Sequence, residues 1–264
     1  MTQTLVTPET TGPRQYAVRR PVTVFLTVVL SLGLASLSLC AALRVPMAPG
    51  ILLTAYVGLT GTALLITRWI GGPAAVRDLL RRLIRWRFGL GRWLTVVFAL
   101  PALTIGVAAA TGTLVAPPRG WLGEAGLYLF ATLIFGALVL NVWEELGWAG
   151  FMQDRLAARH GLLRAALLTA IPFGLVHVPL AFEPGWTPTS AAITIGAVVV
   201  FAPFLRYLLG LFYAGTGSLL AVGVLHAAFN ASGALGMVDG GWQQIPALVL
   251  LTLAVALFHR RRPA

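Results

Sequence analysis

Residues 141–155 read NVWEELGWAGFMQDR and close an apolar run that begins near residue 127. The run carries two adjacent carboxylates, Glu144 and Glu145. An ionised side chain inside lipid costs about 2–3 kcal/mol or more unless it meets partners or water. This stretch therefore predicts a membrane-spanning helix whose glutamates face polar groups from elsewhere in the chain.

The composition is that of a membrane protein. Of the 264 residues, 58% are hydrophobic and 10% are charged, whereas soluble domains carry about 25% charged residues. A spanning helix needs about 20 mostly apolar residues. We predict an all-α polytopic bundle of about eight transmembrane helices, a single domain over residues 21–264, with spans near residues 22–43, 51–70, 93–113, 127–152, 163–181, 190–210, 216–236 and 243–259.

Arginine supplies all 19 basic residues, against 8 acidic residues, for a net charge of +11. Such a charge would suit nucleic-acid binding, but the arginines lie in the short loops between apolar stretches. Arginines in such loops determine the orientation of the helices in the membrane. With a cytoplasmic N-terminus, seventeen of them lie on the cytoplasmic side, Arg206 included, and only Arg44 and Arg119 lie opposite. We expect both termini in the cytoplasm, a multi-pass plasma-membrane location in a bacterium with a GC-rich genome, and no nucleic-acid partner.

Three other segments carry simple expectations. Residues 1–20, rich in Thr and Pro, predict a disordered cytoplasmic tail. Residues 76–88 alternate arginine with Leu, Ile and Trp at helical spacing, which predicts a helix lying in the lipid interface. Cys40 is the single cysteine, so the chain forms no intramolecular disulfide and no cysteine-rich metal cluster.

Two further apolar stretches contain polar groups that lipid would reject. Residues 172–179 read PFGLVHVP and contain His177, and residues 225–230 read LHAAFN and contain His226 and Asn230. Because His226 and Asn230 are four residues apart, they share one helix face. These groups are the candidates to face the two glutamates.

Depth estimates place the candidate groups at a similar level. With a rise of ~1.5 Å per residue, Glu144 and His226 lie about 15 Å from the cytoplasmic edge and His177 about 20 Å. This common level predicts one shared site built by three helices. Adjacent Glu144 and Glu145 diverge by about 100° around their helix, so only one of them can point squarely into the site.

A carboxylate, two imidazoles and a carboxamide suit the hydrolysis of an amide or ester. A carboxylate in a low-dielectric cavity can act as a general base for water, and imidazole and carboxamide N–H groups can hold that water or stabilise an oxyanion. Glu144, His177 and His226 could also ligate zinc. The chain has no His-Glu-x-x-His helix and no Gly-x-Ser-x-Gly turn, which disfavours a gluzincin or a serine hydrolase.

At these residues the chain resembles the CPBP family of intramembrane proteases, also called the Abi or type II CAAX prenyl endopeptidase family. Members carry Glu-Glu-x-x-x-Arg, Phe-x-x-x-His and His-x-x-x-Asn or Asp on three helices. The corresponding segments here are Glu144 to Ala149, Phe173 to His177, and His226 to Asn230. The resemblance places the family-like core at about residues 125–236.

The resemblance implies an intramembrane endopeptidase that hydrolyses a peptide or a membrane-associated protein. It implies catalytic residues Glu144, Glu145, His177, His226 and Asn230, with Glu144 as the base and the histidines and Asn230 as water and oxyanion groups. The resemblance leaves both a zinc-dependent and a metal-free mechanism possible. Bacterial relatives are described as metalloproteases, whereas eukaryotic members resemble glutamate-dependent enzymes without an essential metal.

Ala149 departs from the motif, since it stands at the arginine position. An arginine there would lie four residues after Glu145, in reach of an ion pair. Without it, Glu145 can be protonated, bond to Asn141 or pair with Arg155. The departure also leaves open a catalytically impaired member that acts as a membrane scaffold or bacteriocin-immunity-type binding protein, and a proton-coupled transporter is a more distant third function.

Overall fold

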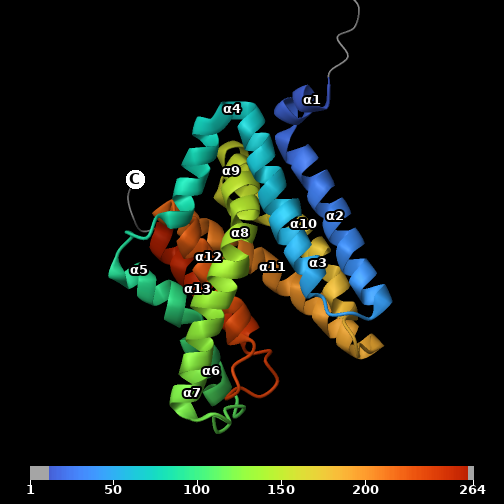
Figure 1. The fold of residues 1–264 in the computed structure, drawn as a ribbon. Helices are drawn as coiled ribbons and strands as arrows, with labels where there is room; N and C mark the ends of the chain where they lie inside the picture. Colours follow the sequence, from blue (N-terminus) through green and yellow to red (C-terminus); the bar gives the residue numbers. More distant parts are fainter. Residues whose placement is uncertain (1–11, 261–264) are drawn as a thin grey trace, which may run out of the picture.

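The computed structural model describes residues 12–260, which form helices and no strand. Six helical segments of this range are long and apolar enough to cross a membrane. Figure 1 shows them gathered into one bundle. They run over Pro21–Leu43, Ala48–Ile84, Leu90–Ala110, Gly120–His160, Leu162–Phe182 and Pro188–Thr216.

Two further apolar helices are shorter than a span: α12 (Leu219–Ser232, 14 residues) and α13 (Gln244–Arg260, 17 residues). All eight predicted apolar stretches therefore contain helix, and the all-α membrane bundle is confirmed, although only six helices have spanning length. Residues 221–229 of α12 are all buried. Because α12 is enclosed by protein, the thickness of the lipid does not set its length.

The long segments combine α-helical stretches with short 3₁₀-helical and π-helical stretches. Four of these inserts are π-helical, a form that often occurs at functional sites. The divisions are α2 (Pro21–Leu43); α3 (Ala48–Leu53), η1 (Thr54–Gly61), α4 (Thr62–Arg81) and η2 (Arg82–Ile84); α5 (Leu90–Leu94), η3 (Thr95–Ala99) and α6 (Leu100–Ala110); α7 (Gly120–Leu129), η4 (Phe130–Asn141), α8 (Val142–Glu145), η5 (Leu146–Gln153) and α9 (Asp154–His160); α10 (Leu162–His177), η6 (Val178–Phe182) and α11 (Pro188–Thr216).

A bend in α4 follows from its sequence. Gly72 has φ 69° and ψ −164°, a backbone conformation that glycine reaches without steric cost, and Pro73 after it lacks an N–H to continue the helix. Figure 1 shows the chain turning sharply within α4. The helix expected over residues 76–88 forms as far as Ile84, and its place in the lipid interface stays a prediction.

The N-terminal segment differs from the expectation of a disordered tail over residues 1–20. Residues 1–11 lie outside the described part of the chain, but Pro13–Arg19 form a helix, α1. Ala17 is 1% exposed, so one face of α1 packs against the bundle. The Thr- and Pro-rich composition does not reveal this contact, and the disorder prediction is wrong for α1.

Helix α12 lies against α8 because of a glycine. A Cβ at Gly223 would stand 2.4 Å from Cγ2 and 2.7 Å from Cα of Val142, so only glycine allows this approach. The start of α12 is fixed by Ser218, whose hydroxyl accepts a hydrogen bond from the Ala221 N–H at 3.0 Å. The crossing brings His226, one turn after Gly223, to the level of the glutamates.

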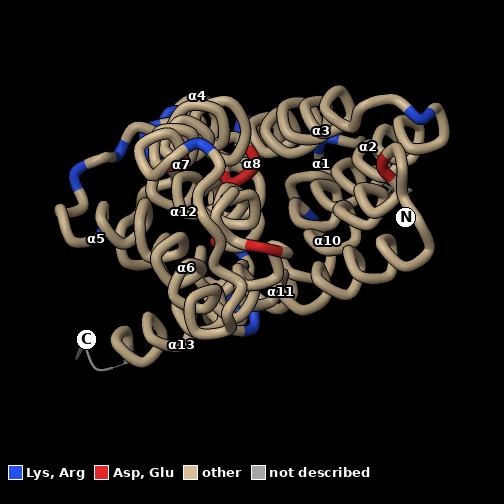
Figure 2. The backbone as a smooth tube through the Cα atoms, turned by 90° about the horizontal axis from the view of Figure 1, so that it is seen from below, with Lys and Arg blue, Asp and Glu red and all other residues tan. Residues whose placement is uncertain are grey.

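The charged residues follow the outline of this bundle. Figure 2 shows most arginine positions at its periphery, whereas an acidic segment beside α8 lies among the helices. The bundle's interior therefore holds few charges, and those it holds need partners.

Candidate active site

The two adjacent glutamates point to different surroundings, as the helical geometry predicts. Glu145 is completely buried, whereas the Glu144 side chain is 12% exposed. Glu144 accepts a hydrogen bond from Nδ2 of Asn141 at 3.1 Å. Asn141 is therefore a partner of the first glutamate, whereas the sequence had suggested it for the second.

His177 ends α10 and is held by its own helix. Its Nδ1 lies 2.6 Å from the carbonyl oxygen of Phe173, and its ring lies 4.4 Å from the Phe173 ring, centroid to centroid. Because a carbonyl oxygen only accepts, Nδ1 donates in this contact and Nε2 is the free ring nitrogen.

His226 approaches the glutamates from α12. Its Nδ1 lies 2.9 Å from Oε1 of Glu145 and 4.0 Å from Oε2 of Glu144. One turn later, Nδ2 of Asn230 lies 3.5 Å from Oδ1 of Asn141. Both polar residues on this face of α12 therefore contact the helical segment that carries the glutamates: His226 contacts Glu145, and Asn230 contacts Asn141.

One cavity of about 260 Å³ joins these groups. Glu144, His177, His226 and Asn230 all line it, so the predicted meeting of three helices is confirmed in the geometry. Glu145 does not line it. The other lining residues are mostly apolar: Leu37, Ile51, Thr54, Leu59, Leu140, Asn141, Trp148, Phe173, Val176, Leu180 and Phe201.

The partner of Glu145 is Arg206, for which the arginine pattern predicts a place on the cytoplasmic side. That prediction is wrong, because Arg206 is 0% exposed and lies within α11. Its Nη1 donates to both oxygens of Glu145, at 2.7 and 2.9 Å. Arg155, an earlier candidate for this pair, instead donates to the Phe151 carbonyl and stacks over the Phe151 ring at 3.9 Å.

Gln153 completes the buried network. Its Oε1 accepts from Nε and Nη2 of Arg206 at 3.2 and 2.7 Å, and its Nε2 donates to the Arg206 carbonyl at 3.0 Å. Neither residue was identified from the sequence. The signal was available for Arg206, since the apolar run continues for a further ten residues beyond it to Thr216.

The Phe173 ring contacts the Arg206 guanidinium and both imidazoles. The Arg206 Cζ is 5.4 Å from the Phe173 ring centroid, within the range of a cation–π contact. The same ring lies 5.8 Å from the His226 ring. Phe173 therefore contacts both the buried ion pair, through Arg206, and the two cavity histidines.

The comparison with known families matches this part of the molecule. Residues 126–232 match the family model described as type II CAAX prenyl endopeptidase, Rce1-like. This stretch, which is less than half of the chain, is therefore similar to that family. The match contains all three polar segments, from Glu144 to Asn230, and it confirms the resemblance to the CPBP family.

One curated protein is similar to this chain over a shorter stretch. A protein named CAAX prenyl protease 2, from Methanococcus maripaludis, is 40% identical over 53 residues. The similar stretch is 20% of this chain and 20% of that protein. The chain therefore matches about one fifth of the length of this relative.

The three anticipated zinc ligands do not gather as a metal-binding group in this site. Within residues 12–260, no three His, Cys, Asp or Glu side chains gather as a metal-binding group. Nδ1 of each histidine makes a hydrogen bond, to Phe173 or to Glu145, so Nε2 is the ring nitrogen left to contact a ligand. The anticipated zinc ligands Glu144, His177 and His226 share a cavity without forming a ligand set, and we derive no step through a metal.

Proposed function

We propose that the protein is an intramembrane endopeptidase that hydrolyses a peptide bond of a membrane-associated protein or peptide. The observation that supports this most is the cavity, because side chains from several helices line it and they include one carboxylate and two imidazoles. The family match over residues 126–232 supports the same reaction class.

In this proposal Glu144 is the general base. It takes a proton from a water molecule while the water oxygen attacks the carbonyl carbon of the scissile bond. His177 orients the water through Nε2. His226 also accepts a hydrogen bond from the water through Nε2, and Asn230 faces the carbonyl oxygen, where its amide N–H stabilises the negative charge. The proton held by Glu144 then passes to the leaving amine nitrogen as the C–N bond breaks.

The apolar part of the cavity indicates the kind of substrate. Leu37, Ile51, Leu140 and Phe201 line it together with the polar groups. An extended segment with apolar side chains next to the scissile bond would bury them there, at about 25 cal/mol per Å² of apolar surface. We therefore propose a substrate that lies in or on the membrane.

The scaffold alternative loses its main support in the structure. It rested on Ala149, which appeared to leave Glu145 without a cation. Arg206 provides that cation from another helix. Every polar group that the proposed reaction needs is then present, so we favour the catalytic function over a purely binding one.

The test is reconstitution of the purified protein in liposomes with a library of apolar peptides, followed by mass spectrometry of the products. We expect paired fragments from a single hydrolysed bond, formed equally in buffer with and without a metal chelator. Absence of paired fragments across the library and a native membrane extract would overturn the proposal. If cleavage is lost in chelator and restored by zinc, the proposed mechanism without a metal is wrong.

A further inference from the structure

We propose that Arg206 is a positioning residue that acts on the cavity through Glu145 and His226, and that Ala149 is the small residue that gives it room. This inference rests on the proposed function, because it concerns how the polar groups of the same site are held. It assigns a role to a buried arginine that lies outside the three polar segments and outside the cavity lining.

The first step is the ion pair itself. Arg206 and Glu145 are both 0% exposed, so neither charge can be solvated by water. One guanidinium nitrogen contacts both carboxylate oxygens. The pair therefore keeps Glu145 charged and fixed, with both oxygens acting as acceptors.

The second step passes from Glu145 to the cavity. Oε1 of Glu145 also lies 2.9 Å from Nδ1 of His226. A charged carboxylate only accepts, so it holds the proton on Nδ1 and leaves Nε2 to serve the reaction. Without Arg206, Glu145 would be a lone buried carboxylate that takes up a proton, and the constraint on the His226 tautomer would be lost.

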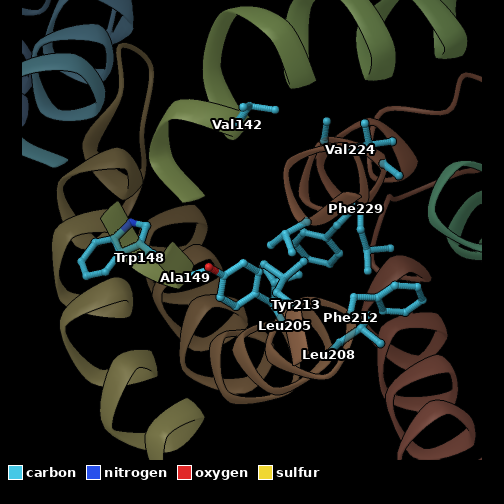
Figure 3. Close-up of a cluster of buried hydrophobic side chains, with 14 of the residues drawn as sticks. Val142, Trp148, Ala149, Leu205, Leu208, Phe212, Tyr213, Val224 and Phe229 are labelled. Atoms are coloured by element: carbon cyan, nitrogen blue, oxygen red, sulfur yellow. The ribbon is translucent and has the colours of Figure 1, made fainter. Parts of the chain in front are cut away.

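The third step explains the position of the arginine. Arg206 contacts Glu145 and Gln153, which lie four residues before and four residues after Ala149. The guanidinium thus spans the helix surface on which residue 149 lies. Ala149 is 1% exposed, and Figure 3 shows it in the same buried cluster as Leu205, the neighbour of Arg206 in the chain.

Gly210 supports the same arrangement. It lies one turn after Arg206 on α11, and a Cβ there would stand 2.3 Å from Nε2 of Gln153. Gly210 of α11 therefore makes room for Gln153, in the way proposed for Ala149 of the facing helix and Arg206.

The test exchanges the two positions. Arg206→Met and Ala149→Arg, each alone, should lower kcat about 10- to 100-fold, as is usual when a group supporting an active residue is lost, while KM changes little. Ala149→Arg combined with Arg206→Met should recover most of the lost kcat, because one guanidinium again faces Glu145. Arg159→Met, at an exposed arginine of α9, is the matched control and should leave kcat unchanged.

A second readout does not require activity. The chain has four histidines, so ¹⁵N-histidine labelling gives a simple NMR spectrum in which His226 is assigned by its absence in His226→Gln. We expect Nδ1-protonated His226 in the parent protein and in Arg206→Lys, and a changed tautomer in Arg206→Met. If Arg206→Met does not fold, Arg206→Lys and the double variant carry the test.

The outcomes separate this inference from the proposed function. A protein that cleaves no peptide but shows the His226 change contradicts the proposed function and supports the role of Arg206. A protein that cleaves normally as Arg206→Met, or whose His226 signals do not respond to that change, overturns the role. If kcat of the double variant is no higher than kcat of the single variants, the proposed relation between Ala149 and Arg206 is wrong.

Discussion

Glu144 and Glu145 are neighbours of identical chemistry with different surroundings. Glu144 borders the cavity and bonds to Asn141, whereas Glu145 is enclosed by Arg206 and His226. The sequence predicts that they diverge, because adjacent helical residues point about 100° apart. It does not predict the partner of Glu145, because the pair joins residues 61 positions apart and local spacing carries no information about such contacts.

Glu145→Gln is expected to destabilise the protein strongly. It leaves the Arg206 charge buried without a counter-charge, and removing one partner of a buried ion pair costs about 3–5 kcal/mol. Thermal unfolding in detergent measures this loss. Glu183→Gln, at an exposed glutamate, is the control and should change stability by less than about 0.5 kcal/mol. An equally small effect of Glu145→Gln would contradict the buried pair.

Asn141→Leu is expected to lower kcat with little change in stability. Asn141 is 1% exposed, and its amide lies within reach of both Glu144 and Asn230. Leucine fills the same space but leaves the base unrestrained, and a misplacement of about 1 Å can cost about 100-fold in rate. Steady-state kinetics and thermal unfolding of the same preparation separate the two effects. Unchanged kcat would remove Asn141 from the site.

At the scale of elements, the positions of the helices could be predicted but their internal geometry could not. Apolar runs of about 20 residues show where helices lie. The π-helical turns of η4 and η5 and the bend at Gly72 do not change hydropathy, so the runs do not reveal them. The cytoplasmic position predicted for Arg206 is wrong for a related reason. The positive-inside rule treats it as a loop residue, whereas α11 continues past it to Thr216.

Gly223→Ala is expected to separate α12 from α8. Its methyl group would meet the backbone of Val142 at 2.7 Å, and backbone cannot rotate away. Overpacking of this kind costs about 1–3 kcal/mol, and the shift would also move His226 away from Glu145, so both unfolding temperature and cleavage should fall. Gly215→Ala, with nothing within 4 Å of its Cβ, is the control. If both alanine variants behave alike, the close crossing is wrong.

At the scale of the whole molecule, the arginine bias predicts both termini on the cytoplasmic side. Arg206 must be removed from that count, yet the remaining bias is still strong because only Arg44 and Arg119 lie opposite. Figure 1 is compatible with this orientation, because α1 and the connection between η6 and α11 lie at opposite ends of the bundle.

This orientation can be tested with single cysteines. In a Cys40→Ser background, Gln15→Cys on α1 and Glu183→Cys before α11 are both at exposed positions. We expect a membrane-impermeant maleimide added outside intact cells to label residue 183 and to label residue 15 only after the membrane is opened. Labelling of both positions from outside would contradict the predicted topology, and the reverse pattern would invert it.

The turnover number of Glu144→Gln in liposomes tests whether Glu144 is the general base of the proposed reaction. Glutamine keeps the size and the hydrogen bonding of the side chain but cannot take a proton from water, and general-base catalysis contributes about 10²- to 10⁴-fold to a rate. With Glu183→Gln as the control for a surface glutamate, we predict a fall in kcat of at least about 100-fold in Glu144→Gln alone. A Glu144→Gln protein that cleaves at the parental rate would show that Glu144 is not the general base.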